Sequence, residues 1–316
     1  MYGRWRKNVG SAAGLLTFYV LLLAKVSLAA GGQADQAQSP PPPGKHDQRS
    51  VYVGAAFNMM ELGKPGAEGW QEVRDSGAKL HVHPTGWRGQ WDKIGPAIRS
   101  NFQTPYFLYE FDIVDPRNGV NNLEEISKVE AFGMICEAAF CNVDGREMLN
   151  NRDQLISDYR SMVSNPLKRR GIFLYFTFSP VASPEVVERM PELLEGNYWL
   201  TLAKECGADG IGLDFPCSYW RVQSYRERLV EFIRGARENG LPVLIIDSIT
   251  SETDIEDLAE MYAGLEIADA LPDAWNMGQF HGPSYALVPE QDPSGLPSGT
   301  ATGAALWLFR HGFGKK

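Results

Sequence analysis

The stretch Tyr198–Tyr219, YWLTLAKECGADGIGLDFPCSY, holds the pattern that decides the fold. Its first half has apolar residues at helical spacing and stops at Gly207, and glycine commonly ends a helix because it adopts a positive φ. The second half is a short apolar run, Ala208–Asp214, whose last residue is acidic. The stretch therefore predicts a helix, a tight stop and a buried strand with Asp214 at its carboxyl end.

The same order of helix and strand recurs along the chain. Six further runs are short and rich in β-branched or aromatic residues: Val51–Phe57, Ala78–His83, Pro105–Asp112, Gly171–Phe178, Pro242–Asp247 and Glu266–Leu271. Amphipathic stretches separate them, and Gly77 and Gly240 follow two of these stretches as helix-ending glycines. Alternation of this kind is typical of a parallel sheet with crossover helices.

Seven such units within residues 51–316 favour a single-domain (β/α)8 TIM-like barrel, whose usual size is ~250 residues. A doubly wound open sheet is the alternative. That fold usually has a glycine-rich phosphate loop after its first strand, whereas FNMMELGKPG follows the first run here. The eighth unit is left open, because Thr302–Phe309 suits either a last strand or a last helix.

The N-terminus has the build of a secretory signal. Residues 1–29 combine early basic residues, an apolar middle and a small-residue exit, which predicts cleavage after Ala29 and a secreted or periplasmic protein. Retention as a membrane anchor is the alternative, although the apolar run is short and holds Lys25. Residues 30–50 contain Pro40–Pro43 and little apolar content, which predicts a disordered linker before a catalytic domain at 51–316.

The charge of the chain argues against one class of partner. The signal segment holds four basic residues and no acidic one, so the rest has 26 Lys and Arg against 39 Asp and Glu, a net charge of −13. An acidic surface repels phosphate backbones, so we expect no nucleic-acid partner.

Four cysteines are present, and an even number in an exported chain favours disulfides. The spacing suggests the pairs Cys136–Cys141 and Cys206–Cys217, although four cysteines allow three pairings. The first pair falls in the segment Asp115–Asn151, which we interpret as a long loop with a helix on the substrate side of the barrel. No CxxC pair occurs, so a zinc site is disfavoured.

Active residues of parallel barrels lie at the carboxyl ends of the strands. Polar residues that end the predicted strands are Asn58, His81, His83, Glu110, Asp112, Thr177, Ser179, Asp214, Asp247 and Asp273. An aspartate after a strand is often only the N-cap of the next helix. Several carboxylates on one rim would nonetheless shift one another's pKa, as in catalytic clefts.

The order of residues around Asp214 resembles the nucleophile strand of retaining (β/α)8 glycoside hydrolases of the α-galactosidase and α-amylase type. The resemblance covers about 20 residues and departs from the amylase type at Gly212, where an arginine is expected. It also falls on the fifth predicted strand rather than the fourth. It implies a glycoside hydrolase that needs no metal or organic cofactor, with Asp214 as nucleophile.

Glycoside hydrolysis needs two carboxyl groups, ~5–5.5 Å apart in retaining and ~6.5–9.5 Å apart in inverting enzymes. Asp247, one strand later, is the first candidate for general acid/base, and Glu110 is the second. Aromatic and polar residues near strand ends suit a carbohydrate substrate, because sugar rings have apolar faces and polar edges. The predicted substrate-binding residues are Asp112, His83, Arg88, Trp87, Trp220, Asp273 and Trp275.

Two other functions stay open. The barrel could bind a glycan or cell-wall polymer without cutting it. His81 and His83 share one strand face, as metal ligands would, and resemble the His-x-His of metal-dependent amidohydrolases. Those enzymes need further histidines from later strands, and only His281 and His311 remain in the fold.

Overall fold

The computed structural model of the chain describes residues 49–54, 76–82, 95–96, 99, 104–111, 122–143, 151–178, 198–248, 252–278 and 301–313. The chain divides into residues 1–40 and 41–316, and every described residue lies in the second unit. The predicted signal segment 1–29 and nearly all of the predicted linker 30–50 therefore lie outside the described residues. No described helix has the length and apolar character needed to cross a membrane.

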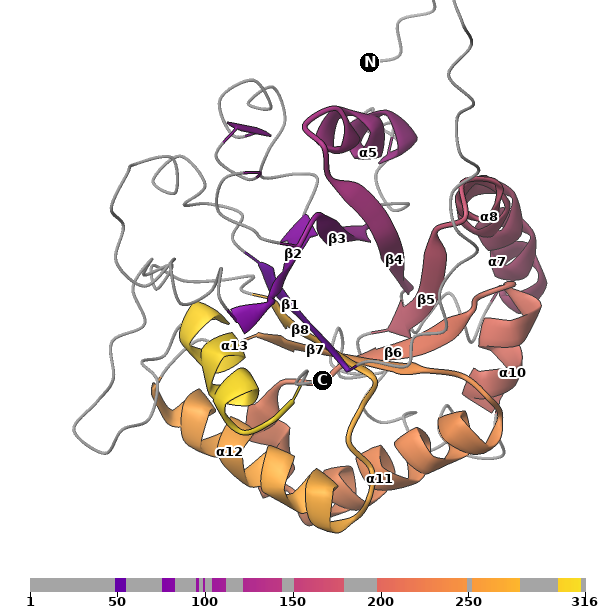
Figure 1. Ribbon diagram of the computed structural model, residues 1–316. Coiled ribbons are helices and arrows are strands. Elements are labelled where there is room, and N and C mark those ends of the chain that lie inside the picture. Colours follow the sequence, from indigo (N-terminus) through magenta and orange to yellow (C-terminus); the bar gives the residue numbers. More distant parts are fainter. Residues whose placement is uncertain are drawn as a thin grey trace, which may run out of the picture. The chain divides into compact units, whose positions relative to one another are not determined.

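Parallel strands close into a barrel in the order of the chain (Figure 1). Each strand pairs with its successor, and the last pairs with the first. The strands are β1 (Ser50–Gly54), β2 (Lys79–Val82), β3 (Tyr106–Glu110), β4 (Ile135–Val143), β5 (Phe173–Phe178), β6 (Gly210–Asp214), β7 (Val243–Ser248) and β8 (Ala274–Gly278). The predicted (β/α)8 barrel is confirmed, and the open doubly wound sheet is not formed.

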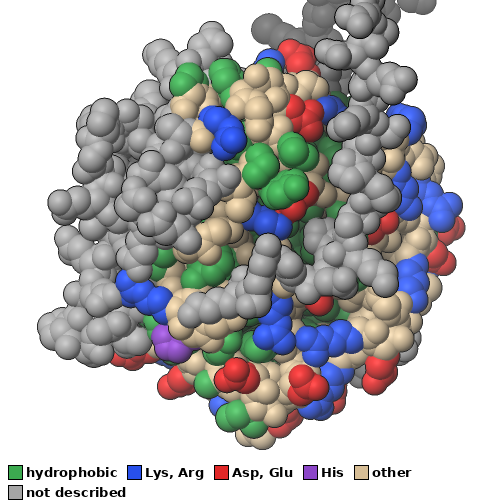
Figure 2. Space-filling model, in the orientation of Figure 1, with side chains coloured by type: hydrophobic (Ala, Val, Ile, Leu, Met, Phe, Trp, Pro, Cys, Tyr) green, Lys and Arg blue, Asp and Glu red, His purple; other side chains and the backbone are tan. Residues whose placement is uncertain are grey.

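Helices lie outside the ring of strands (Figure 1). The described ones are α5 (Asn122–Glu130), α7 (Arg152–Tyr159), the π-helix η2 (Arg160–Ser164), α8 (Asn165–Arg169), α10 (Tyr198–Glu205), the 3-10 helix η4 (Cys217–Arg221), α11 (Gln223–Glu238), α12 (Glu252–Ile267) and α13 (Ala301–Arg310). The segment Thr302–Phe309 therefore belongs to the last helix. Figure 2 shows both acidic and basic side chains on the described part of the face in view.

The stop at Gly207 has the predicted cause. Gly207 has a φ of 76°, and its N–H donates to the Lys204 carbonyl. The Ala208 N–H donates back to the Ala203 carbonyl at 3.0 Å. This pair of bonds satisfies the last carbonyls of α10 and turns the chain directly into β6.

Two strand predictions were wrong. Glu266–Leu271 is not a strand, because α12 continues to Ile267 and the last strand is Ala274–Gly278. The predicted loop Asp115–Asn151 contains β4, which the sequence analysis missed. Asp214 consequently ends the sixth strand rather than the fifth.

A β-bulge explains why β4 was hard to recognise. The register with β3 shifts between Phe107 and Leu108, which pair with Cys136 and Ala138, so Glu137 is an extra residue. Ala138 faces the barrel interior, and the Glu137 side chain accepts a hydrogen bond from the inward Tyr52 hydroxyl at 2.6 Å. Two consecutive inward residues break the alternation that identifies a strand in sequence.

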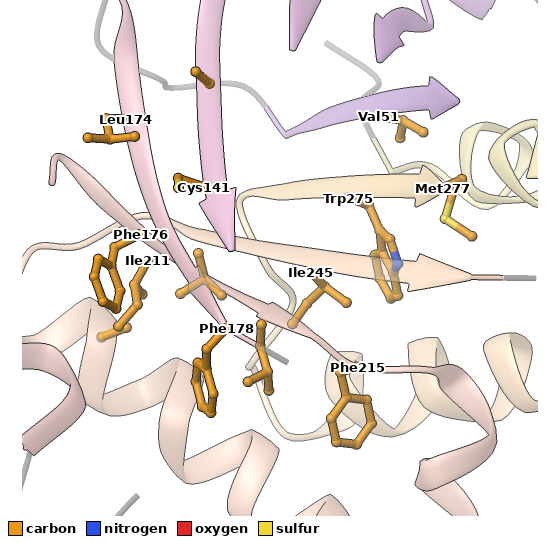
Figure 3. Close-up of a cluster of buried hydrophobic side chains, with 14 of the residues drawn as sticks. Val51, Cys141, Leu174, Phe176, Phe178, Ile211, Phe215, Ile245, Trp275 and Met277 are labelled. Carbon is orange, nitrogen blue, oxygen red and sulfur yellow. The ribbon is translucent and has the colours of Figure 1, made fainter. Parts of the chain in front are cut away.

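The larger part of the core lies between the barrel and its helices. Figure 3 shows outward residues of this layer, among them Phe176, Ile211, Ile245 and Trp275. Trp199 of α10 packs there, with its ring 3.8 Å from that of Phe178 between centroids. Alternate residues of the same strands form the separate interior cluster.

The cysteines form no disulfide, so the predicted pairs are wrong. All four side chains are buried. Cys136 and Cys141 lie on one extended strand, where five residues span ~16 Å, far beyond the ~7 Å limit for a bridge. Cys206 and Cys217 lie on opposite sides of β6 in the chain, so the length of that strand separates them.

Candidate functional site

Inward side chains stack in layers of four from alternate strands, as in other barrels of this type. The strand register puts Tyr52, Leu108, Tyr175 and Leu244 in one apolar layer. The next layer toward the carboxyl ends holds His81, Phe140, Gly212 and Asn276. Glu110 and Thr177 follow in the layer above, and Asn142 and Asp214 lie higher still. The interior thus changes from apolar to polar toward the end where barrels bind substrates.

Glycines of β6 make room for side chains from β5. A Cβ on Gly210 would lie 2.8 Å from the Tyr175 ring, and a Cβ on Gly212 would lie 2.3 Å from Cγ2 of Thr177. The sequence GIGLD therefore reserves space in the barrel for larger side chains of the neighbouring strand. This leaves Asp214 as the first inward side chain of β6, at the carboxyl end.

His81 and Glu110 form the central contact of this polar end. Nε2 of His81 lies 3.5 Å from Oε2 of Glu110, and the two side chains are 3% and 13% exposed. Burial lowers the pKa of His81 to about 3, so the imidazole is neutral at pH 7. The contact is therefore one between a neutral imidazole and a carboxyl group, and not an ion pair.

Thr177 and Asn142 form a second polar contact on β5 and β4. The Thr177 hydroxyl donates to Oδ1 of Asn142 at 2.7 Å. Thr177 is fully buried and Asn142 is half-buried. The bond fixes Thr177, whose methyl covers Gly212, and orients the Asn142 amide at the mouth of the barrel.

Asn276 is the least expected residue of this group. It is fully buried on β8, between Tyr52 and Ile246 in the register of the flanking strands. Within the described part of the chain, neither Oδ1 nor Nδ2 of Asn276 has a hydrogen-bond partner. A buried amide without partners is costly, and native proteins usually satisfy such groups with protein, water or ligand.

Sequence reasoning missed Asn276 and Asn142 for different reasons. Asn276 lies in AWNMG, which was interpreted as a segment after a strand rather than a strand. Asn142 lies in the missed strand β4. A single amide inside an otherwise apolar run was the available signal in both cases.

Asp247 does not join the predicted carboxylate pair. It follows the inward Ile246, so its side chain points away from the barrel interior, and it is fully buried. Its Oδ1 accepts a hydrogen bond from the Cys217 backbone N–H at 3.0 Å. Asp247 thus holds the turn that follows Asp214.

Asp273 lies at the opposite end of the barrel from the predicted position. It precedes β8, and its Oδ2 accepts a hydrogen bond from the Val243 N–H at 2.8 Å. Asp209 makes the equivalent bond to the Leu174 N–H at 3.0 Å. Both aspartates satisfy the first residues of a neighbouring strand, so the prediction of a rim position for Asp273 was wrong.

The two described tryptophans of the predicted substrate site lie in the outer core. Trp275 is fully buried and packs against Tyr262 and Phe313. Trp220 is 7% exposed and covers Gly264 of α12, where a Cβ would lie 2.1 Å from its ring. The remaining predicted site residues lie outside the described residues, namely His83, Trp87, Arg88 and Asp112.

A second polar cluster closes the amino-terminal end of the barrel. Lys79 Nζ donates to Glu137 Oε1 at 2.6 Å and to Ser50 Oγ at 3.0 Å. Burial, with Glu137 beside it, raises the pKa of the Tyr52 hydroxyl well above its usual value. These groups satisfy one another.

The described ranges hold no group of three or more His, Cys, Asp or Glu residues that could bind a metal ion. Of the predicted metal pair, only His81 is described.

No family model matches the chain, and no curated protein matches it in sequence. Solved structures with a similar fold include Rhizobium etli pyruvate carboxylase, with 12% identity and a TM-score of 0.44 over 72% of this chain. The match spans 23% of that protein's chain. A 3-keto-D-glucoside 4-epimerase from E. coli has 11% identity and a TM-score of 0.45, with 84% of this chain and 100% of that chain covered. An archaeal fructose 1,6-bisphosphate aldolase has 14% identity and a TM-score of 0.43, with 72% and 84% covered.

The prediction of a glycoside hydrolase is wrong. The similar structures include a carboxylase, aldolases, a lyase and an epimerase, and none of these is described as a glycoside hydrolase. In this chain Asp247 points away from the interior, and the described tryptophans are buried in the outer core.

Proposed function

We propose that this chain is an enzyme that transfers protons on a small polar substrate at the carboxyl end of its barrel. The contact between His81 and Glu110 carries the proposal. Glu110 is the base that removes a proton from a carbon next to a carbonyl group. His81 donates a hydrogen bond to the carbonyl oxygen, where negative charge develops.

The neutral state of His81 supports this division of roles. A neutral imidazole with one N–H can stabilise a developing oxyanion without carrying a permanent charge into the buried site. Its low pKa keeps the imidazole neutral at pH 7 and down to about pH 4. Glu110 lies on β3, next to the strand of His81, and in the layer directly above His81. One small substrate can therefore contact both side chains.

Asp214 supplies a second carboxylate nearer the mouth. It is half-buried, and the Cys217 turn beyond it is held by Asp247. We assign Asp214 to a substrate hydroxyl group, whose proton a carboxylate accepts as a hydrogen bond. Asp247 is a positioning residue in this proposal.

The test is solvent deuterium incorporation. The full chain is incubated in D2O with neutral hydroxy-ketones and hydroxy-aldehydes of two to six carbons, and loss of the C–H signal beside the carbonyl is followed by NMR. Glu110→Gln should reduce the exchange rate at least ~100-fold, the lower range for a general base. Glu124→Gln, on the exposed face of α5, is the matched control. Equal exchange by Glu110→Gln and the native protein would contradict the proposal.

A further inference from the structure

Asn276 presents a hydrogen-bonding problem that the described protein groups do not solve. Its amide has two donors and an acceptor oxygen, and both heavy atoms are buried without partners in the described ranges. The neighbouring Tyr52 hydroxyl is directed to Glu137, so it is engaged elsewhere. Ile246 and Phe140 are apolar.

His81 lies in the same layer as Asn276. Its Nε2 is buried and makes no hydrogen bond to the described residues, since its contact with Glu110 is 3.5 Å long. The other members of the layer are Phe140 and Gly212. This layer therefore holds three buried polar atoms without hydrogen-bond partners among the described residues, namely Nε2 of His81 and both amide atoms of Asn276.

The chemistry of the two groups defines what can satisfy them together. The amide of Asn276 matches a hydroxyl group, because a hydroxyl both donates and accepts hydrogen bonds. The neutral imidazole of His81 suits a carbonyl oxygen. Glu110 and Asp214 lie above them, and these carboxylates oppose a phosphate or carboxylate at this depth.

We propose that Asn276 and His81 bind the two oxygens of a neutral hydroxy-carbonyl compound, the hydroxyl on Asn276 and the carbonyl on His81. The inference deepens the proposed function, since it names the substrate class of the same site. Asn276 determines specificity, because a compound without the hydroxyl leaves the buried amide unsatisfied.

The experiment measures binding rather than turnover. Hydroxyacetone is titrated into the full chain by ligand-observed NMR and compared with acetone, which lacks the hydroxyl, propane-1,2-diol, which lacks the carbonyl, and glycolate, which is charged. Hydroxyacetone should bind at least ~10-fold more tightly than each of the other three. Equal or tighter binding of any of them overturns the inference.

Variants locate the binding site. Asn276→Leu keeps the branch at Cγ and the number of side-chain heavy atoms but removes the amide, and it should remove the preference for hydroxyacetone over acetone. Asn239→Leu, at the exposed end of α11, should keep the preference. An Asn276→Leu protein that folds and keeps the preference would show that the hydroxyl group of the ligand does not bind to the Asn276 amide, which also overturns the inference.

Two further measurements keep the outcomes separate. If Asn276→Leu does not fold, thermal unfolding of the native protein tests the inference instead. Hydroxyacetone should raise the Tm of the native protein, whereas acetone at the same concentration should not. Equal shifts in Tm would overturn the inference. Glu110→Gln should still bind hydroxyacetone. If Glu110→Gln exchanges deuterium as fast as the native protein, and Asn276→Leu loses the preference for hydroxyacetone over acetone, the proposed proton transfer is refuted but the binding inference is supported.

Discussion

The packing of β5 on β6 gives a prediction whose size follows from the structure. In Gly212→Ala the new Cβ would lie 2.3 Å from Thr177 Cγ2, while ordinary contact begins at 3.4 Å, so the two carbons must separate by about 1.1 Å. Thr177 cannot turn aside freely, because its hydroxyl is bonded to Asn142. Overpacking of this kind costs about 1–3 kcal/mol.

The matched background is Thr177→Ser, which removes the clashing methyl and keeps the hydroxyl. Gly212→Ala should lower the free energy of unfolding by about 1–3 kcal/mol in the native background. It should cost less than about 1 kcal/mol in Thr177→Ser, where the remaining close contact is with the Leu244 carbonyl at 3.2 Å. Urea unfolding of the four proteins measures both values. An equal cost in the two backgrounds would refute the packing argument.

Three further predictions concern single groups. The free energy of unfolding should rise with pH between about 3 and 6.5, because His81 is neutral in the folded protein and binds a proton in the unfolded chain. In urea unfolding, His81→Gln should reduce this rise by up to ~1.4 kcal/mol per pH unit, and an unchanged pH dependence would contradict the burial of a neutral imidazole. Burial raises the pKa of the Cys136 thiol and raises the pKa of the Cys206 thiol to about 12. A thiol reagent at pH 8 should therefore label both cysteines in denaturant but neither in the native protein, and fast labelling of the native protein would be inconsistent with their burial. Asp273→Ala should lower the free energy of unfolding by about 1–3 kcal/mol, because the Val243 N–H loses its hydrogen-bond acceptor. Hydroxyacetone binding should not change, and weaker binding would indicate that Asp273 belongs to the binding site.

The sequence identifies the fold because helix stops and buried strands are local signals. Gly207 and the apolar run after it specify the turn into β6 without knowledge of the rest of the chain. The sequence did not reveal strands β4 and β8, because these local signals are weak or interrupted there. Glu137 interrupts the alternation of β4, and the five residues of β8 are too few to stand out after the long helix α12.

The site was less accessible from sequence because the side a residue faces depends on register. Asp214 is the last residue of β6 and Asp247 the last but one of β7. Asp214 faces the barrel interior, whereas Asp247 follows the inward Ile246 and packs outside. The sequence does not single out Asn276, because an isolated asparagine is informative only when its surroundings are known to be buried. The signal segment, export and the roles of His83, Trp87, Arg88 and Asp112 stay predictions.

The glycines of β6 also bear on how this chain can change over evolutionary time. The volume missing at positions 210 and 212 is filled by side chains at positions 175 and 177. Neither member of each pair can grow alone, so the sizes of the two residues should covary among relatives: a larger residue on β6 should accompany a smaller one on β5. Such compensating exchanges would mark the descent of this barrel even where overall sequence similarity has disappeared.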